Sequence, residues 1–343
     1  LHVRSRRQRQ MCIRDRLWNP CNNGRCPLSN RGAAVLLTGG DRIREKRGHG
    51  KDVRSLQECW RGLINNMEMM TSNELKNSLV ELLCDFDLFA RKNNLRYSLA
   101  YGTLLGSIRH QGFIPWDDDI DLWMPRPDFE RMLSIPYVGE VDVCLKSHLN
   151  GRFLFPYAKL TRADVEIDDP FWNSCGKQNL FIDIFPLDGL PDDPSSVEHL
   201  YREALKIKND IAKSDVGIGF EKSAFRKIAK RAYIALRGGR RWRTRSYEKM
   251  QSLWSAYPYE DSTTVGMYAF PTPGLIEIME KSDFETAISK GKFEGRDFPI
   301  PGNWDPILEC LYGDYMTPPA PSQRSGHGLK AYKVALSQVE KQR

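Results

Sequence analysis

The sequence has no hydrophobic run long enough to cross a membrane. A membrane-spanning helix needs about 20 consecutive apolar residues, and no segment of the chain approaches that length. The early apolar patch at residues 33–37 is also too short for the core of a signal peptide. The sequence therefore predicts neither a membrane-spanning helix nor a secretion signal.

The cysteines show no metal-binding or redox pattern. No CxxC pair occurs, and no Cys and His residues have the spacing of a zinc site. Of the eight cysteines, four lie within residues 1–66 and the other four are far apart in the chain. We expect these last four to be reduced thiols, as in a cytosolic compartment. They are Cys84, Cys144, Cys175 and Cys310.

The main part of the chain lacks a surplus of positive charge. Residues 1–66 carry 15 Lys or Arg and 5 Asp or Glu, whereas residues 67–343 have a net charge of −3. The basic excess is thus confined to the N-terminal segment, and no nucleic-acid partner is expected for the rest.

Residues 1–66 differ from the rest in other ways. They are rich in Arg, Gly, Asn and Cys and show no helical or strand periodicity. We expect a basic extension that is disordered or not native, with the native start among the methionines at positions 67, 69 and 70. The alternative is a basic arm for an anionic membrane or nucleic acid. A catalytic domain is expected over residues 67–330, followed by a tail at 331–343.

The remaining pattern predicts an α+β fold. Thr71 and Glu74 have the spacing of a capping box, and an apolar stripe follows them. Helices are expected at residues 71–94, 103–110, 128–133 and 305–312, with a charged helical region over 197–245. Strands are expected at 95–100, 117–124, 141–145, 153–160, 165–167 and 180–185, with a turn at 161–164.

Two acidic residues mark the most informative segment. Asp119 and Asp121 alternate with apolar residues, so on a strand they would face the same side. Two neighbouring carboxylates repel each other, and a divalent cation with oxygen ligands, Mg²⁺ or Mn²⁺, relieves that repulsion. A solvated acidic loop is the alternative, although the apolar neighbours disfavour it.

A third acid lies in the apolar segment LFIDIF at residues 180–185. Asp183 is costly to bury without a partner, so it is either a hydrogen-bonded structural residue or a third metal ligand on a neighbouring strand. Three such carboxylates suit two divalent cations that assist in-line phosphoryl transfer. We therefore expect Asp119, Asp121 and Asp183 to form a catalytic metal site.

The segment before these acids is expected to bind phosphate. Gly106 and Ser107 were assigned to a tight turn, where glycine allows close backbone approach and the hydroxyl donates to a phosphate oxygen. Arg109 adds a positive charge nearby. A short helix after Gly102 would also point its N-terminal N–H groups at an anion.

These motifs resemble a known family. Residues 101–132 read YGTLLGSIRHQGFIPWDDDIDLWMPRPDFERM, and residues 181–193 read FIDIFPLDGLPDD. Residues 293–319 and the SGHG at residues 325–328 complete the pattern. The sequence resembles the LicD family of phosphocholine-type transferases, within the nucleotidyltransferase superfamily, to which fukutin-related proteins also belong. The resemblance covers roughly residues 71–328 and none of residues 1–66.

The resemblance implies a nucleotidyltransferase-like mixed sheet flanked by helices, with a helical insertion. It implies an enzyme that transfers phosphocholine or a polyol phosphate from a CDP-linked donor, such as CDP-choline or CDP-ribitol, to a glycan hydroxyl, as in lipopolysaccharide or teichoic acid modification. Asp183 is the first candidate for the general base and His327 the second, with an idle tail histidine as the alternative. Lys159 either binds phosphate or is a solvated surface charge.

Other functions remain open on the sequence. The Asp-x-Asp motif also suits a GT-A-like glycosyltransferase that uses a nucleotide-sugar, although Gly106 and Ser107 disfavour this. A non-catalytic glycan- or nucleotide-binding module and a polymerase-type nucleotidyltransferase are further alternatives. A bacterial member would be cytoplasmic, at the membrane surface where glycans are assembled. A eukaryotic member would lie in the Golgi lumen behind an anchor.

Overall fold

The computed structural model describes residues 68–137, 143–151, 153–168, 178–215, 224–285, 289–324, 326 and 328–334. The predicted N-terminal extension at residues 1–66 lies outside this part of the chain, as do Cys175 and His327. The domain boundaries therefore stay predictions.

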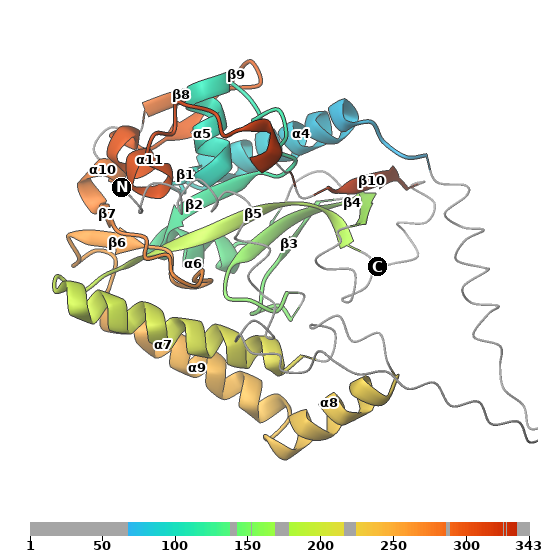
Figure 1. The fold of residues 1–343 in the computed structure, drawn as a ribbon, viewed down its shortest axis with the longest axis vertical. Coiled ribbons are helices and arrows are strands. Elements are labelled where there is room, and N and C mark those ends of the chain that lie inside the picture. The colour runs from blue at the N-terminus through green and yellow to red at the C-terminus, as the bar shows by residue number, and fades with distance from the viewer. Residues whose placement is uncertain are drawn as a thin grey trace, which may run out of the picture. The chain divides into compact units, whose positions relative to one another are not determined.

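The described chain contains both helices and strands (Figure 1). The helices are α4 (Ser72–Lys92), α5 (Tyr101–His110), α6 (Arg126–Ser134), α7 (Pro194–Lys213), α8 (Ala224–Leu236), α9 (Arg240–Ala256), α10 (Lys281–Glu285) and α11 (Trp304–Tyr312). The strands are β1 (Ser98–Leu99), β2 (Asp121–Pro125), β3 (Val143–Lys146), β4 (Ala158–Asp168), β5 (Gln178–Gly189), β6 (Thr264–Gly266), β7 (Met279–Glu280), β8 (Ser289–Phe293), β9 (Arg296–Ile300) and β10 (Lys330–Lys333).

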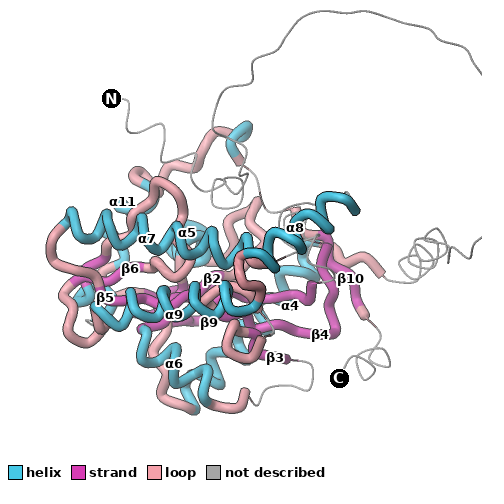
Figure 2. Tube along the Cα trace, turned by 90° about the horizontal axis from the view of Figure 1, so that it is seen from below, coloured by secondary structure: helices cyan, strands magenta, loops and turns pink. Residues whose placement is uncertain are grey.

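A mixed sheet forms the centre of the fold. Its main path runs β1-β2-β5-β4-β10, with β3 paired to β4 and β6 paired to β5. Strands β2 and β5 are parallel, whereas the other described pairs are antiparallel. Helices α4, α5 and α6 pack against this sheet, and α7 and α9 lie side by side below it (Figures 1 and 2). The predicted α+β class with a mixed sheet and flanking helices is confirmed.

Helix α4 begins at the predicted capping box. Thr71 Oγ1 accepts a hydrogen bond from the Glu74 N–H, and the Glu74 carboxylate accepts one from the Thr71 N–H. Its apolar stripe, from Leu75 to Phe89, is buried. The first expected helix is therefore confirmed to within two residues at each end.

Three local predictions are wrong. Gly106 and Ser107 lie inside α5, so the helix expected at residues 103–110 is confirmed and the tight turn is not. The residues expected to form a turn at 161–164 continue β4, which is irregular between Arg162 and Glu166. Strand β2 begins at Asp121, so Asp119 belongs to the connecting loop. The two strand errors arose because the local pattern was read without the partner strand that decides the hydrogen bonding.

None of the described helices has both the length and the apolarity that a membrane span requires. The longest, α4 and α7, each carry several charged residues among their apolar positions.

Candidate active site

Three charged residues occupy aligned positions on adjacent strands. Asp121 on β2 pairs with Asp183 on β5, and Asp183 pairs in turn with Lys159 on β4. Residues that face each other across strands project to the same side of a sheet. The prediction that Asp121 and Asp183 lie on neighbouring strands is therefore confirmed, and Lys159 extends the row. We call these three residues the charged row.

Lys159 and Asp183 form a largely buried ion pair. The distance from Lys159 Nζ to Asp183 Oδ1 is 2.6 Å, and the side chains are 4% and 15% exposed. The same ammonium lies 3.2 Å from the centre of the Phe181 ring. Cation–π attraction and the carboxylate together offset the cost of removing this charge from water. The alternative that Lys159 is a solvated surface charge is wrong.

Backbone hydrogen bonds fix the start of β2 against its neighbours. The Asp121 N–H donates to Thr103 Oγ1 at 2.9 Å, and the Asp183 N–H donates to the Ile120 carbonyl at 2.9 Å. The Ala100 N–H donates to the Asp121 carbonyl at 3.0 Å. Thus the first turn of α5 and strand β5 both hold the backbone of Asp121, whose side chain is 7% exposed.

The acidic loop before β2 is covered by the C-terminal segment. Asp118 Oδ2 accepts a hydrogen bond from the Leu329 N–H at 3.0 Å, and the Arg324 guanidinium lies 4.8 Å from the centre of the Trp116 ring. A Cβ on Gly326 would come within 2.2 Å of the Trp116 carbonyl, so only glycine fits. The residues on either side of position 327 thus contact the acidic loop. His327 itself lies outside the described residues.

The carboxylates suit a divalent cation in type but are not gathered around one. Within the described ranges, no three His, Cys, Asp or Glu side chains are close enough to hold a metal ion. Asp183 is instead neutralised by Lys159. Oxygen donors on Asp121 and Asp183 fit Mg²⁺ or Mn²⁺. The three-ligand site with Asp119, which is half-buried in the loop, stays a prediction.

Gly106 and Ser107 contact protein groups on the side of α5. A Cβ on Gly106 would come within 2.4 Å of the Gly112 carbonyl, so glycine allows the loop after α5 to pack closely. Ser107 Oγ donates to the Lys292 carbonyl on β8 at 2.9 Å. The helical rise puts Ser107 about 6 Å further along the axis than Thr103. Phosphate binding by Gly106 and Ser107 stays a prediction.

Arg109 points toward the C-terminal region. Its Nη1 donates to the Tyr315 carbonyl, and burial lowers the pKa of the guanidinium. Its Nη2 is buried, with no hydrogen-bond partner within the part of the chain that the structure describes. Phosphate binding by Arg109 stays a prediction.

Sequence reasoning missed the aromatic surroundings of Lys159. Besides Phe181, the rings of Phe153 and Tyr157 lie 5.4 and 5.7 Å from its ammonium. The sequence held a hint of this, because Tyr157 and Lys159 are two residues apart, as are Phe181 and Asp183. This is the spacing of side chains on one face of a strand. It was not used, since cross-strand pairing cannot be read from one sequence.

A second missed feature is the ion pair between Arg126 and Asp188. Arg126 binds both carboxylate oxygens of Asp188 at 2.5 and 2.7 Å, and the side chains are 9% and 1% exposed. The guanidinium also lies 4.1 Å from the centre of the Trp254 ring. This pair joins α6 to the end of β5 and to α9, and so braces the strand that carries Asp183.

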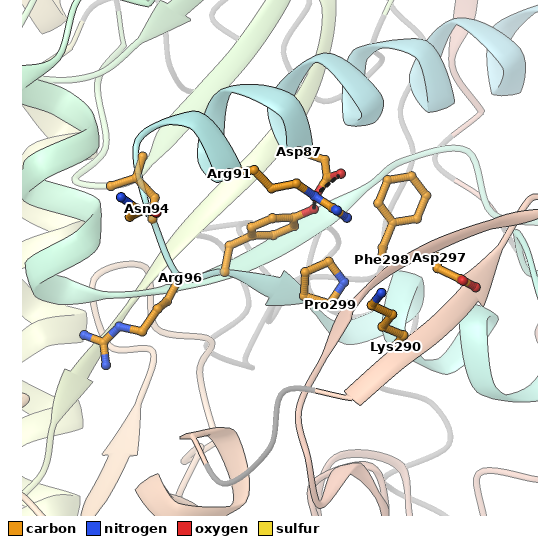
Figure 3. Close-up of a pocket in the computed structure, with 10 residues that line it drawn as sticks. Asp87, Arg91, Asn94, Arg96, Lys290, Asp297, Phe298 and Pro299 are labelled. Atoms are coloured by element: carbon orange, nitrogen blue, oxygen red, sulfur yellow. Dashed lines mark hydrogen bonds and ion pairs between the residues drawn. The ribbon is translucent and has the colours of Figure 1, made fainter.

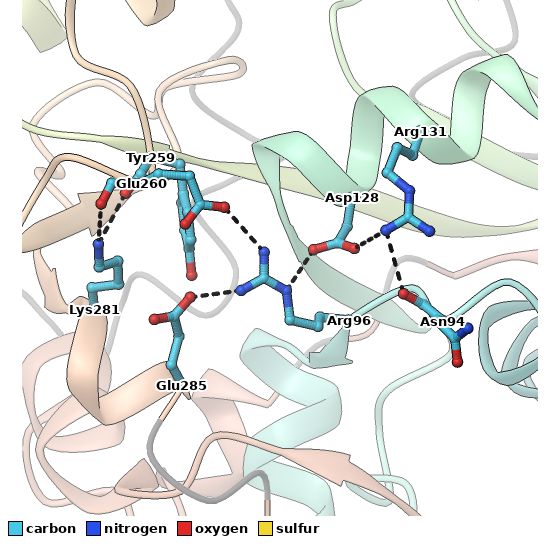
Figure 4. A network of polar contacts seen from close by, with 8 residues as sticks. All are labelled: Asn94, Arg96, Asp128, Arg131, Tyr259, Glu260, Lys281 and Glu285. Carbon is cyan, nitrogen blue, oxygen red and sulfur yellow. Dashed lines mark hydrogen bonds and ion pairs between the residues drawn. The ribbon is translucent and has the colours of Figure 1, made fainter.

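A cavity of about 430 Å³ lies away from the charged row (Figure 3). It is bounded by the end of α4 and by β9, with Arg91, Tyr97 and Phe298 among its lining residues. Beside it, Arg96 forms ion pairs with Asp128, Glu260 and Glu285 (Figure 4). This network joins the start of β1 to α6 and α10. None of the predicted site residues lines the cavity.

Comparison with known proteins shows which family this chain resembles. Residues 94–208, which include the charged row, match the model for "LicD/FKTN/FKRP, nucleotidyltransferase domain". The chain is 26% identical over 280 residues to the lipopolysaccharide cholinephosphotransferase LicD of Haemophilus influenzae, covering 78% of this chain and 99% of the relative.

Two shorter matches are to uncharacterized proteins. One, from Rickettsia prowazekii, is 36% identical over 84 residues, or 21% of this chain and 32% of that protein. The other, from Rickettsia typhi, is 47% identical over 59 residues, or 16% and 19%. The family model covers the segment that holds the acids, and the Haemophilus protein matches almost from end to end, so the predicted resemblance to the LicD family is confirmed.

Proposed function

We propose that this protein is a phosphotransferase that moves phosphocholine from a CDP-linked donor to a hydroxyl of a surface glycan. The observation that carries the proposal is the charged row, which lies within the LicD-family domain. The Haemophilus relative is named for cholinephosphate transfer to lipopolysaccharide. A polyol phosphate such as ribitol phosphate is the next donor group to test.

The transfer breaks the bond between the alcohol-bearing phosphorus and the oxygen that bridges it to CMP. The acceptor oxygen forms the new bond to that phosphorus, its proton passes to a general base, and CMP leaves with the bridging oxygen. Positioning and charge stabilisation account for most of the catalysis in such reactions. Lys159 supplies positive charge beside Asp183, where phosphate oxygens would lie.

Asp183 is the proposed general base, with His327 as the second candidate. Asp183 is 15% exposed and therefore accessible to an acceptor hydroxyl while its other contacts hold it in place. Asp121 lies at the paired position on β2 and would orient the donor phosphates together with Lys159. Gly106, Ser107 and Arg109 remain candidates for binding the other side of the CDP-linked donor.

Mg²⁺ or Mn²⁺ is the proposed cofactor. Asp121 and Asp183 would hold it, with Asp119 joining from the loop. A bound cation would neutralise charge that develops on the transferred phosphoryl group. Because Lys159 already contacts Asp183, a bound cation would share that carboxylate with the ammonium.

The test is a donor screen with nucleotide release as the readout. The full chain is incubated with Mn²⁺, a glycan acceptor and CDP-choline, CDP-ribitol or a nucleotide-sugar. The proposal expects CMP release that depends on the acceptor and stops with EDTA. Release of CDP from a CDP-sugar would instead identify a glycosyltransferase. No turnover with any donor would favour the binding-module alternative.

A further inference from the structure

Helix α8 has an apolar face that no described part of the chain covers. Four large apolar side chains on it are exposed: Phe225 (78%), Ile228 (63%), Tyr233 (44%) and Leu236 (88%). At 100° per residue, Phe225, Ile228 and Leu236 fall on one side of the helix, together with its exposed alanine Ala232. We call this side the apolar face of α8.

The opposite side of α8 is basic. The sequence from residue 224 to residue 245 contains nine Lys or Arg and no Asp or Glu. On the helix, Arg226 and Arg231 are exposed and lie outside the arc of the apolar face, and exposed Arg237 follows directly after its last residue. The part of the chain outside residues 1–66 has a net negative charge, so this basic cluster is a local exception.

Contacts that hold α8 are concentrated at its C-terminal end. Tyr233 packs edge-on against Trp242 at 5.8 Å, and the Arg237 guanidinium lies 5.2 Å from the Trp242 ring. The glycines Gly238 and Gly239 then turn the chain into α9, both with positive φ. In Figure 1 α8 projects at an angle from the end of α9, away from the sheet.

We propose that α8 is an interfacial helix that docks the protein on an anionic membrane surface. A helix of this kind lies in the plane of the interface, with its apolar side chains among the acyl chains and its basic residues at the headgroups. The basic flank matches the negative potential of anionic lipids. No described helix spans a membrane, so this contact is peripheral.

The charge pattern favours lipid over a protein partner. A protein interface would be expected to leave the core of the contact poor in charge and to mix both signs at its rim. Here charge of one sign surrounds the apolar face, and no acid lies within the helix to pair with a second copy. Docking would place the enzyme where a glycolipid acceptor of the proposed reaction is found.

Vesicle flotation of the full chain tests the proposal. Vesicles of phosphatidylcholine alone are compared with vesicles that also contain phosphatidylglycerol. We expect binding to the anionic vesicles that is at least about tenfold tighter than to the neutral ones and weakens from about 0.1 to about 0.5 M salt. Absence of binding to either vesicle would overturn the proposal.

Two double variants separate the two sides of the helix. Phe225→Ser with Leu236→Ser should lower binding by about tenfold or more, since each removes buried apolar area from the bilayer. Arg226→Glu with Arg231→Glu should abolish the preference for anionic lipid. Circular dichroism checks that each variant keeps its helical content.

Matched controls lie elsewhere on the surface. Leu88→Ser removes an apolar side chain that is 67% exposed on α4, and Lys206→Glu with Lys213→Glu reverses two exposed charges on α7. Both controls should bind like the wild type. If they lose binding equally, attraction is unspecific and the proposal fails.

A measurement without lipid distinguishes a membrane partner from a second copy of the chain. If light scattering without lipid shows a dimer that the Phe225 and Leu236 variant dissociates, the face is a contact between copies and membrane docking is overturned.

Vesicle binding is measured without donor or acceptor, so its failure is distinct from a failure of the proposed transferase activity. CMP release with a water-soluble acceptor should be unchanged in the α8 variants.

Discussion

Lys159 Nζ lies 2.6 Å from Asp183 Oδ1, and Asp183 pairs across the parallel strands with Asp121. One positive charge is therefore built into the sheet where two carboxylates approach each other. The arrangement explains how the Asp183 side chain is accommodated in an apolar strand. It also means that a substrate phosphate would meet a charge that is already in place.

Replacing Lys159 tests this charge. Lys159→Met keeps the aromatic contacts of the stem but leaves Asp183 without its buried partner. Because Asp183 stays 15% exposed, we expect a loss of about 2–4 kcal/mol in the free energy of unfolding, less than for a fully buried pair. Urea denaturation measures it, and CMP release should fall in the same variant.

Lys146→Met is the matched control for this measurement. Lys146 faces Lys159 on the adjacent strand β3, and its ammonium donates to Asn179 at 3.1 Å. Loss of that hydrogen bond should cost about 1 kcal/mol. Equal destabilisation by the two lysine variants would show that the Asp183 contact adds no more to the free energy of unfolding than the Asn179 hydrogen bond.

Asp121→Asn separates catalysis from stability. The backbone hydrogen bonds of Asp121 do not depend on its carboxylate, so they survive the change. Removing one of two facing carboxylates also relieves repulsion. We expect an unchanged or slightly higher melting temperature and a loss of CMP release of about 10²-fold or more. Full activity in this variant would favour a non-catalytic binding module.

The sequence was informative where a feature is local. The capping box of Thr71 and Glu74 and the apolar stripe behind it depend on spacing alone, and α4 follows them closely. The sequence predicts the partnership of Asp121 with Asp183, because both acids lie among apolar residues on expected strands. The pairing of Asp183 with Lys159 was not, because it depends on the register of β4 against β5.

Gly106 and Ser107 show the limit most clearly. Glycine followed by serine is typical of turns, but Gly106 lies within α5 because its missing Cβ makes room for the Gly112 carbonyl. Gly106 approaches the loop after α5, whereas Ser107 contacts Lys292 on β8, which lies far along the chain. No periodicity in the sequence records such an approach.

Ser107→Ala distinguishes packing from phosphate binding. The hydroxyl hydrogen is already donated to the Lys292 carbonyl, and Ser107 is 3% exposed. We expect a loss of about 1 kcal/mol in unfolding free energy and less than a twofold rise in the KM for the CDP-linked donor. A KM that rises by an order of magnitude would show that this hydroxyl binds the donor.

Asp188→Asn should be among the more destabilising single changes. It leaves the Arg126 guanidinium, 9% exposed, without its bidentate partner. The expected cost is about 3–5 kcal/mol in urea denaturation. Glu198→Gln is the control, since its pair with Arg202 is more than half exposed and should matter by less than about 1 kcal/mol. Similar effects of the two changes would contradict the role given to the buried pair.

His148 should make stability depend on pH. Burial, helped by the positive charge of Arg126, lowers the pKa of His148 to about 4, and its Nδ1 has no hydrogen-bond partner within the described chain. Its ordinary pKa is about 6.5, so below that pH the unfolded chain binds a proton that the folded chain refuses.

The direction of the pH dependence follows from the difference between the folded and unfolded pKa of His148. Stability is full above about pH 6.5 and falls as the pH drops toward about 4, with a loss of about 1–2 kcal/mol by about pH 5.

His148→Phe keeps the ring contact with Tyr247, 5.0 Å away, but cannot titrate. The difference in unfolding free energy between about pH 7.5 and about pH 5 should therefore shrink by that amount in this variant. It should stay the same in His199→Gln, which changes an exposed histidine. An equal pH dependence in wild type and His148→Phe would show that another group controls the acid response.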